Sequence, residues 1–229
     1  MQISDRFPRN HAQGTGRLTV QLTEGDAFCY PLYYFIPSLS GDESTLIYHR
    51  AEAGEIQLHA LDLLSGVSTQ LTQATEADTH WMPWCVDSGR GVLDHRSVLN
   101  TARSEVIYFN GNDVRVVRFR SPSTSERAHG SGPVVVDDRL LFRLPDDRLA
   151  IGQNCVSNDG SWFIYIHHDR DSYAAIYPDG VFQPDRCGSY GTVLAAFNMD
   201  TGEHRELVVI NSPIHHVLPW RDDQFIFCH

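Results

Sequence analysis

The hydrophobic and polar positions of this chain follow one pattern that recurs along its length. Each copy has a short apolar stretch, a tight polar turn around Asp or Gly, and a second stretch rich in β-branched and aromatic residues, which is typical of an antiparallel hairpin. Residues 37–50 align without gaps on residues 83–96, and further copies lie at 155–170 and 219–229. Repeats of this kind, spaced by roughly 40–50 residues, predict the four-stranded blades of a β-propeller.

The second half of each blade is repeated as well. Residues 56–72 resemble residues 193–208, and residues 105–119 supply a similar strand pair. Residues 15–23 resemble an outer strand without a preceding blade, which predicts an N-terminal strand that closes the ring. The predicted fold is therefore one all-β propeller domain over residues 1–229, and residues 121–150 have no assigned place in it. Its segments are a lead-in with the ring-closing strand at 1–27, blades at 28–73, 78–121 and 151–210, and the start of a further blade at 213–229.

Charge and composition exclude several classes of function. Lys and Arg number 18 against 29 Asp and Glu, a net charge of -11, and no basic cluster is present, which argues against a nucleic-acid partner. No apolar run reaches membrane-spanning length and the N-terminus has no signal-peptide core, so we expect a cytoplasmic protein without a membrane partner. Motifs of hydrolase nucleophiles and nucleotide-binding loops are absent from the sequence.

Many of the 12 histidines fall where predicted strands reach one rim of the propeller channel. In a propeller, the first strands begin at the same face to which the connections between second and third strands return. The connection at residues 167–191 is long, and long loops over a rigid scaffold often carry function. A structural role for any single histidine stays open, because a strand-end histidine is commonly a hydrogen-bonded surface residue. The candidate substrate-binding residues are His80, Trp81, Arg170, His215, His216 and His229.

Four stretches carry a resemblance to a known family. They are YYFIPSLSGDESTLIY (33–48), LDLLSGVSTQLT (61–72), NMDTGEHREL (198–207) and, most specifically, SPIHHVLPWRDDQFIFCH (212–229). Over about residues 15–229 the chain resembles the N-terminal part of the oligogalacturonate lyases, propeller polysaccharide lyases related to ulvan lyases. The resemblance implies a seven-bladed propeller, of which this chain holds about three and a half blades. It also implies β-elimination of a 4-linked uronate in pectin degradation, with an acidic oligosaccharide as the partner.

In this family a His base, an assisting Arg and a Mn²⁺ ion held by His and Gln perform the elimination, and the resemblance places all of them after residue 229. It therefore assigns no metal ligand to this chain. His229 matches the histidine of the family's Phe-Cys-His motif, and His215 or His216 matches an earlier rim histidine. One departure is that Cys29-Tyr30-Pro31 stands where the family has Cys-His-Arg. Since the last repeat stops after its second strand, we expect a fragment that is poorly soluble and inactive as this lyase even with Mn²⁺.

Two alternatives remain. In an ulvan-type lyase the earlier blades do the chemistry: histidine is a base near neutral pH, tyrosine donates a proton, and arginine pairs with a carboxylate. The second alternative is a non-catalytic TolB-like propeller that binds a protein or a sugar. The candidate catalytic residues for the ulvan-type reaction are His95, His168, Tyr190 and Arg186.

Overall fold

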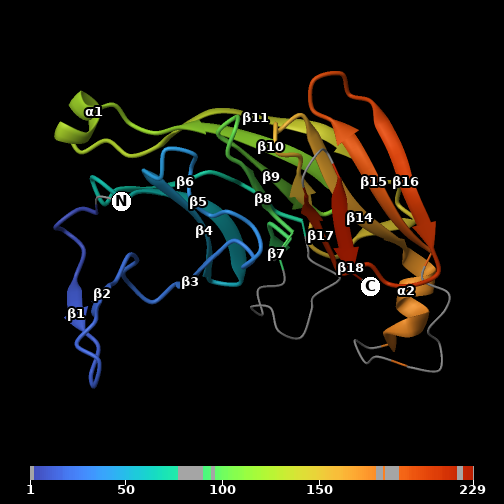
Figure 1. Cartoon of the computed structure of the whole chain (residues 1–229), viewed down its shortest axis with the longest axis horizontal. Helices are drawn as coiled ribbons and strands as arrows, with labels where there is room; N and C mark the ends of the chain where they lie inside the picture. The colour runs from blue at the N-terminus through green and yellow to red at the C-terminus, as the bar shows by residue number, and fades with distance from the viewer. Residues whose placement is uncertain are drawn as a thin grey trace.

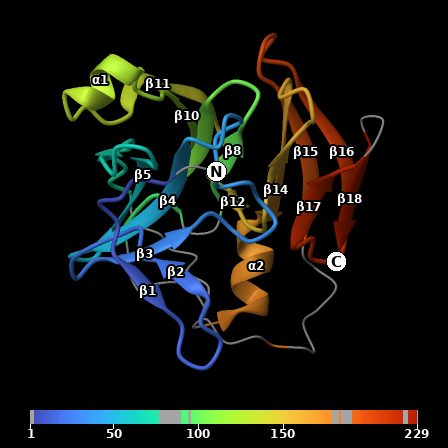
Figure 2. The same ribbon diagram turned by 60° about the vertical axis from the view of Figure 1, so that its left-hand side comes forward.

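Antiparallel sheets stand side by side in chain order and make up most of the molecule (Figures 1 and 2). The structure is a computed structural model, and it describes residues 3–76, 90–93, 96–178, 183, 191–220 and 224–228. In the described residues, three antiparallel sheets, each four strands wide, are followed by a two-stranded sheet. This arrangement is the predicted one, consecutive blades of a β-propeller.

The first sheet is a meander whose strands pair in the order of the sequence. Beside the start of its third strand, β7 (Arg90–Gly91) adds a short parallel pairing. Gly91 has a φ of 105°, and a Cβ atom there would lie 2.2 Å from the carbonyl oxygen of Ile56, so the close approach requires glycine. The four strands are β3 (Phe28–Pro31), β4 (Thr45–Glu52), β5 (Glu55–Asp62) and β6 (Ser68–Gln70).

The described strands of the second sheet extend past the end of the predicted blade at residues 78–121. They run from residue 98 to residue 143, so the segment that the sequence left unassigned supplies the outer strand. A short helix, α1 (Thr124–Ala128), lies between the third and fourth strands and reaches back beside the first sheet (Figure 1). The strands are β8 (Val98–Asn100), β9 (Glu105–Asn110), β10 (Asp113–Arg120) and β11 (Val134–Arg143).

The third sheet has a first strand that is broken into two short pieces, both paired with the second strand. A helix, α2 (Arg170–Ile176), follows the second strand directly and projects from that end of the sheet (Figure 2). The sheet consists of β12 (Arg148–Ala150), β13 (Cys155–Val156), β14 (Trp162–Asp169), β15 (Thr192–Asn198) and β16 (His204–Ile210).

Two-stranded hairpins flank these sheets at both ends of the chain. The N-terminal one joins β1 (Arg9–His11) to β2 (Leu18–Val20), and β2 pairs with β1 rather than completing another sheet of the described chain. The C-terminal one joins β17 (His216–Pro219) to β18 (Phe225–Cys228) and begins the next blade. Neither of the helices in the described part of the chain is long enough to cross a membrane.

The gapless match of residues 37–50 to residues 83–96 is wrong as a structural equivalence. β4 is the second strand of the first sheet, whereas Arg96 comes just before the first strand of the second sheet. The two segments match in sequence because both combine a polar turn with apolar residues. In the structure, however, Arg90 and Gly91 of the second segment pair with β5 of the first sheet. The equivalent second strands are β4, β9 and β14.

A buried tyrosine in the fourth position of each second strand marks the true repeat. The side chain of each tyrosine extends across the third strand, and its hydroxyl group contacts the outer strand of the same sheet. The pairs are Tyr48 with Ser68 Oγ at 2.8 Å, Tyr108 with Asp138 Oδ2 at 3.0 Å, and Tyr165 with His204 Nδ1 at 3.4 Å. The same bond in all three sheets ties the second strand to the blade edge.

The core lies between the sheets, because each blade buries both of its faces. On β14, Phe163 and Tyr165 pack into the cluster shared with the first two sheets. Ile164 and Ile166 alternate with them and pack toward β17 and β18 on the other side. This two-sided burial is what stacked propeller blades require.

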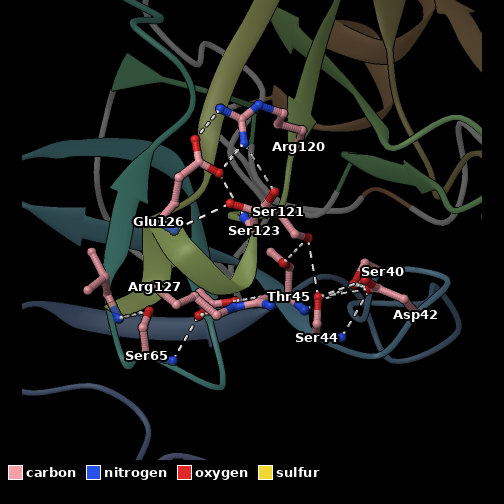
Figure 3. Close-up of polar contacts among 12 residues, drawn as sticks. Ser40, Asp42, Ser44, Thr45, Ser65, Arg120, Ser121, Ser123, Glu126 and Arg127 are labelled. Carbon is pink, nitrogen blue, oxygen red and sulfur yellow. Dashed lines mark hydrogen bonds and ion pairs between the residues drawn. The ribbon is translucent and has the colours of Figure 1, made fainter. Parts of the chain in front are cut away.

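Polar contacts add a second link between the first two sheets (Figure 3). Arg127 of α1 donates to the buried carboxylate of Asp62 at the end of β5, at 2.9 to 3.1 Å. Ser121, which directly follows β10, is hydrogen-bonded to Thr45, at 2.7 Å, and to Ser44, at 3.2 Å. The segment after β10 is thereby fastened to the neighbouring blade.

Candidate functional site

Three of the predicted histidines meet where the third sheet approaches the start of the fourth blade. His168 lies near the end of β14, His215 immediately precedes β17, and His216 begins it. The rings of His215 and His216 are 6.5 Å apart, and His215 lies close enough to lower the pKa of His168. We call His168, His215 and His216 the rim histidine cluster.

The backbone around Gln153 positions two members of this cluster. Here the first strand of the third sheet is interrupted, which frees its peptide groups to bond outside the sheet. The amide of Gln153 donates to the carbonyl oxygen of His215 at 2.7 Å, and the amide of Val217 donates to the carbonyl oxygen of Gln153 at 3.1 Å. The side chain of Asn154, the next residue, donates to the carbonyl oxygen of Arg96, in the segment just before the second sheet. The backbone of the interrupted strand therefore holds the segment that carries His215 and His216 beside the third sheet.

Side-chain contacts fix two of the imidazole rings. Thr192 Oγ1 lies 3.1 Å from His168 Nδ1, and Tyr33 Oη lies 2.9 Å from His216 Nε2. Tyr33 belongs to the turn after β3, so the first blade contributes to a site at the fourth. The Tyr33 ring also stacks on the His216 ring at 5.4 Å.

Gln153 carries a polar atom whose hydrogen-bonding capacity is unused. Its side chain is 2% exposed, and Oε1 has no hydrogen-bond partner among the described residues. A buried acceptor without a partner costs about 1–3 kcal/mol, so a hydroxyl or amide donor is favoured at this position. The site thus offers an acceptor beside the rim histidine cluster.

Burial keeps the rim histidines uncharged at neutral pH. It lowers the pKa of His168 to about 3, with His215 adding to the effect, and it lowers the pKa values of His215 and His216 as well. The cluster therefore presents neutral imidazoles, which donate hydrogen bonds and accept protons but carry no charge.

A pH prediction follows for His168. Its folded pKa lies below the unfolded value of 6.5, so protonation favours the unfolded chain. Its contribution is complete above pH 6.5 and is lost as the pH falls toward 3. We expect the wild type to lose about 1 kcal/mol from this residue between pH 7 and pH 5.5, and the His168→Gln variant to lose that much less. Urea unfolding at the two pH values measures the difference, and an equal loss in both proteins would contradict the assignment.

The other predicted site residues have different positions. Arg170 is the first residue of α2, and its guanidinium donates to the carbonyl oxygens of Asp146 at 2.7 Å and Arg148 at 3.1 Å, so it braces the loop before β12. Six candidates lie outside the described residues, namely His80, Trp81, His95, Arg186, Tyr190 and His229.

Sequence reasoning missed Tyr33 and Thr192. A signal for Tyr33 existed, because it opens an aromatic run whose next members, Tyr34 and Phe35, are 74% and 44% exposed. Adjacent aromatic residues in a turn often mark a binding surface. Thr192 had no comparable signal, since it is the buried first residue of an ordinary strand.

The described residues do not fit the Mn²⁺ ion that the resemblance implies. Tyr33 bonds one ring nitrogen of His216 and Thr192 bonds one of His168. Across the described ranges, no three His, Cys, Asp or Glu side chains are grouped to hold a metal ion. No chemical step is therefore assigned to a metal here.

The fold of the chain is that of part of a β-propeller. No protein-family model matches the chain. An oligogalacturonate lyase of Dickeya dadantii (strain 3937) is 23% identical over 230 residues, covering 100% of this chain and 52% of that protein. An oligogalacturonide lyase of Pectobacterium atrosepticum is 21% identical over 217 residues, covering 94% and 49%.

Solved structures agree with these relatives. A manganese-bound oligogalacturonate lyase superimposes with a TM-score of 0.72 at 19% identity, over 97% of this chain and 52% of that one. An oligogalacturonate lyase of Vibrio parahaemolyticus gives 0.69 at 14% identity, over 99% and 54%. The chain thus resembles the N-terminal half of oligogalacturonate lyases, and it spans about half the length of the relatives it matches.

Proposed function

We propose that this chain is the substrate-binding half of an oligogalacturonate lyase-like propeller, which cleaves uronate oligosaccharides by β-elimination. The observation that carries the proposal is the similarity to two such lyases along 94% or more of the chain. In the reaction a base removes the C5 proton, the C4–O bond breaks, a C4–C5 double bond forms, and the leaving oxygen takes up a proton.

The rim histidine cluster is suited to hold a sugar acid. His215 is exposed and neutral, so it can donate a hydrogen bond to a carboxylate or hydroxyl oxygen, and His216, which Tyr33 holds in place, lies beside it. The exposed ring of Phe35 lies 5.4 Å from that of His216, and the exposed ring of Tyr34 packs on Phe35, so the two provide an apolar surface for a sugar face. We assign these residues to substrate binding.

Binding is tested by calorimetric titration of the 229-residue chain with trigalacturonate and with maltotriose, a neutral sugar of the same length. We expect trigalacturonate to bind more tightly and His215→Ala to weaken it by about tenfold, a loss of about 1.4 kcal/mol. The control is His129→Ala, at an exposed position that ends α1. Equal binding of the two sugars, or equal effects of the two variants, would contradict the proposal.

Elimination by the chain itself separates this proposal from the ulvan-type alternative. We expect no sustained rise in the ultraviolet absorbance of the unsaturated product when digalacturonate is added with Mn²⁺. In the alternative, His168 acts with His95, Tyr190 and Arg186. His168 is 1% exposed, which favours a supporting position behind the exposed His215. Turnover that His168→Ala abolishes would establish the alternative instead.

A further inference from the structure

A cavity lies between the second and third sheets, on the opposite face of β14 from the rim histidine cluster. It has a volume of about 420 Å³, and its lining comes from residues 142–145, Asp147, Arg148 and the strands β14, β15 and β16. Ligand sites commonly have volumes of about 300–1,000 Å³, so a monosaccharide-sized molecule fits. We call this cavity the interblade pocket.

A buried histidine without a complete set of partners lines the interblade pocket. His167 is 7% exposed, and its Nδ1 atom has no hydrogen-bond partner among the described residues. Leaving such a group unsatisfied costs about 1–3 kcal/mol. Its burial lowers the pKa to about 4, so the ring is neutral and can bond a polar ligand without a charge penalty. His167 thus places a buried ring with unused hydrogen-bonding capacity at the wall of the cavity.

One guanidinium of the lining forms no ion pair within the described residues, although Asp169 lies opposite it on β14. Arg143 is paired with Asp113 at 2.7 Å, and Arg205 is paired with Glu203 at 2.7 Å. Arg148, in contrast, has no ion pair within the described chain and donates only to the carbonyl oxygen of Gly191, at 3.2 Å. An unpaired guanidinium is suited to bind one carboxylate through two hydrogen bonds.

The remaining lining selects for hydroxyl groups and against further negative charge. Asp147 and Glu206 are exposed residues of the lining, and their carboxylates can accept hydrogen bonds from hydroxyls and would repel a second anionic group. Phe142 and Leu144 supply apolar surface for the face of a sugar ring. A phosphate dianion matches this lining poorly, whereas a polyhydroxylated monocarboxylate matches it well.

We propose that the interblade pocket binds a monomeric sugar acid, with its carboxylate on Arg148 and a hydroxyl group on His167. The inference comes from the lining alone and does not require that the rim histidine cluster binds substrate. It adds a second acid-sugar site, between blades rather than at the channel rim.

The experiment is a titration of the chain with D-galacturonate, followed by NMR of the histidine rings, with D-galactose as the neutral comparison. We expect the ring resonances of His167 to move with galacturonate at a dissociation constant at least about tenfold lower than with galactose. Arg148→Gln should raise that constant by at least about tenfold. Arg143→Gln, at a guanidinium already paired in the same lining, should change it far less.

Since the readout is at His167, a failure of binding at the rim histidine cluster leaves it unaffected. If Arg148→Gln does not fold, His167→Leu serves instead, with calorimetry as the readout and the same loss of affinity expected. Unmoved His167 resonances, equal affinities for the two sugars, or an Arg148→Gln variant that binds like the wild type would overturn the proposal.

Discussion

Replacing Arg127 by alanine is expected to lower the free energy of unfolding by about 3 kcal/mol. The carboxylate of Asp62 is fully buried, and Arg127 contacts both of its oxygens, while the Ser65 amide donates a further bond at 2.8 Å. Removing Arg127 leaves that charge buried without its cation. The value is at the lower end for buried pairs because the Arg127 side chain keeps 20% exposure.

Arg120→Ala is the matched control, measured beside Arg127→Ala by urea unfolding. Arg120 forms an ion pair of similar length, 2.7 Å, with Glu126 of the same short helix, but both partners are largely in water (Figure 3). Its loss should therefore be much smaller. Adding Asp62→Asn to Arg127→Ala should restore part of the stability, since the unpaired charge is gone. Equal losses in the two single variants would show that the Asp62 contact does not join the blades.

Phe109→Ala is expected to destabilise the chain by about 3–5 kcal/mol. Phe109 is fully buried in the core shared by the first three sheets, with its ring 6.2 Å from that of Phe163 in the next blade. Truncation removes apolar contacts and leaves a cavity between sheets that backbone pairing holds at a set distance.

Phe28→Ala serves as the control for this change, because Phe28 is 59% exposed on a first strand. We expect a far smaller loss there, measured by thermal and urea unfolding of both variants. If Phe109→Ala were no worse than Phe28→Ala, the packing of blade against blade would not be the main source of stability.

The fold class was predictable because polar turns leave a clear local signature. Ser40, Asp42 and Ser44 form a hydrogen-bonded turn before β4, and Ser157, Asp159 and Ser161 repeat it before β14. The second sheet lacks this turn, because Ala102 stands where the other two sheets have Asp. The sequence comparison therefore aligned the first repeat with residues 83–96 instead of with β9. A tyrosine at the fourth position of each second strand was the better marker.

The outer strand β11 was unpredictable for a physical reason. It lies at a blade edge and begins with three consecutive valines, Val134, Val135 and Val136, which are all exposed. Its start therefore does not show the alternation of hydrophobic and polar residues that marks a half-buried strand. First strands such as β8 and β13 are only two or three residues long, too short to show any period.

The placement of His168, His215 and His216 at one site followed from strand ends alone. The contact of Tyr33 with His216 did not, because it joins residues 183 positions apart and depends on how blades are arranged around the channel. The interblade pocket was equally hidden, since the outer strand that covers it had no predicted place. His167 and His168 are neighbours in sequence, yet alternation along β14 sends them to different sites.

Binding of uronate oligosaccharides by the rim histidine cluster is tested most directly by NMR of histidine rings during titration with trigalacturonate. The ring resonances of His215 and His216 should move with one saturating dissociation constant, and those of His59 and His129, which lie outside the cluster, should stay in place. Unmoved His215 and His216 resonances, or shifts of similar size at all four histidines, would contradict the account.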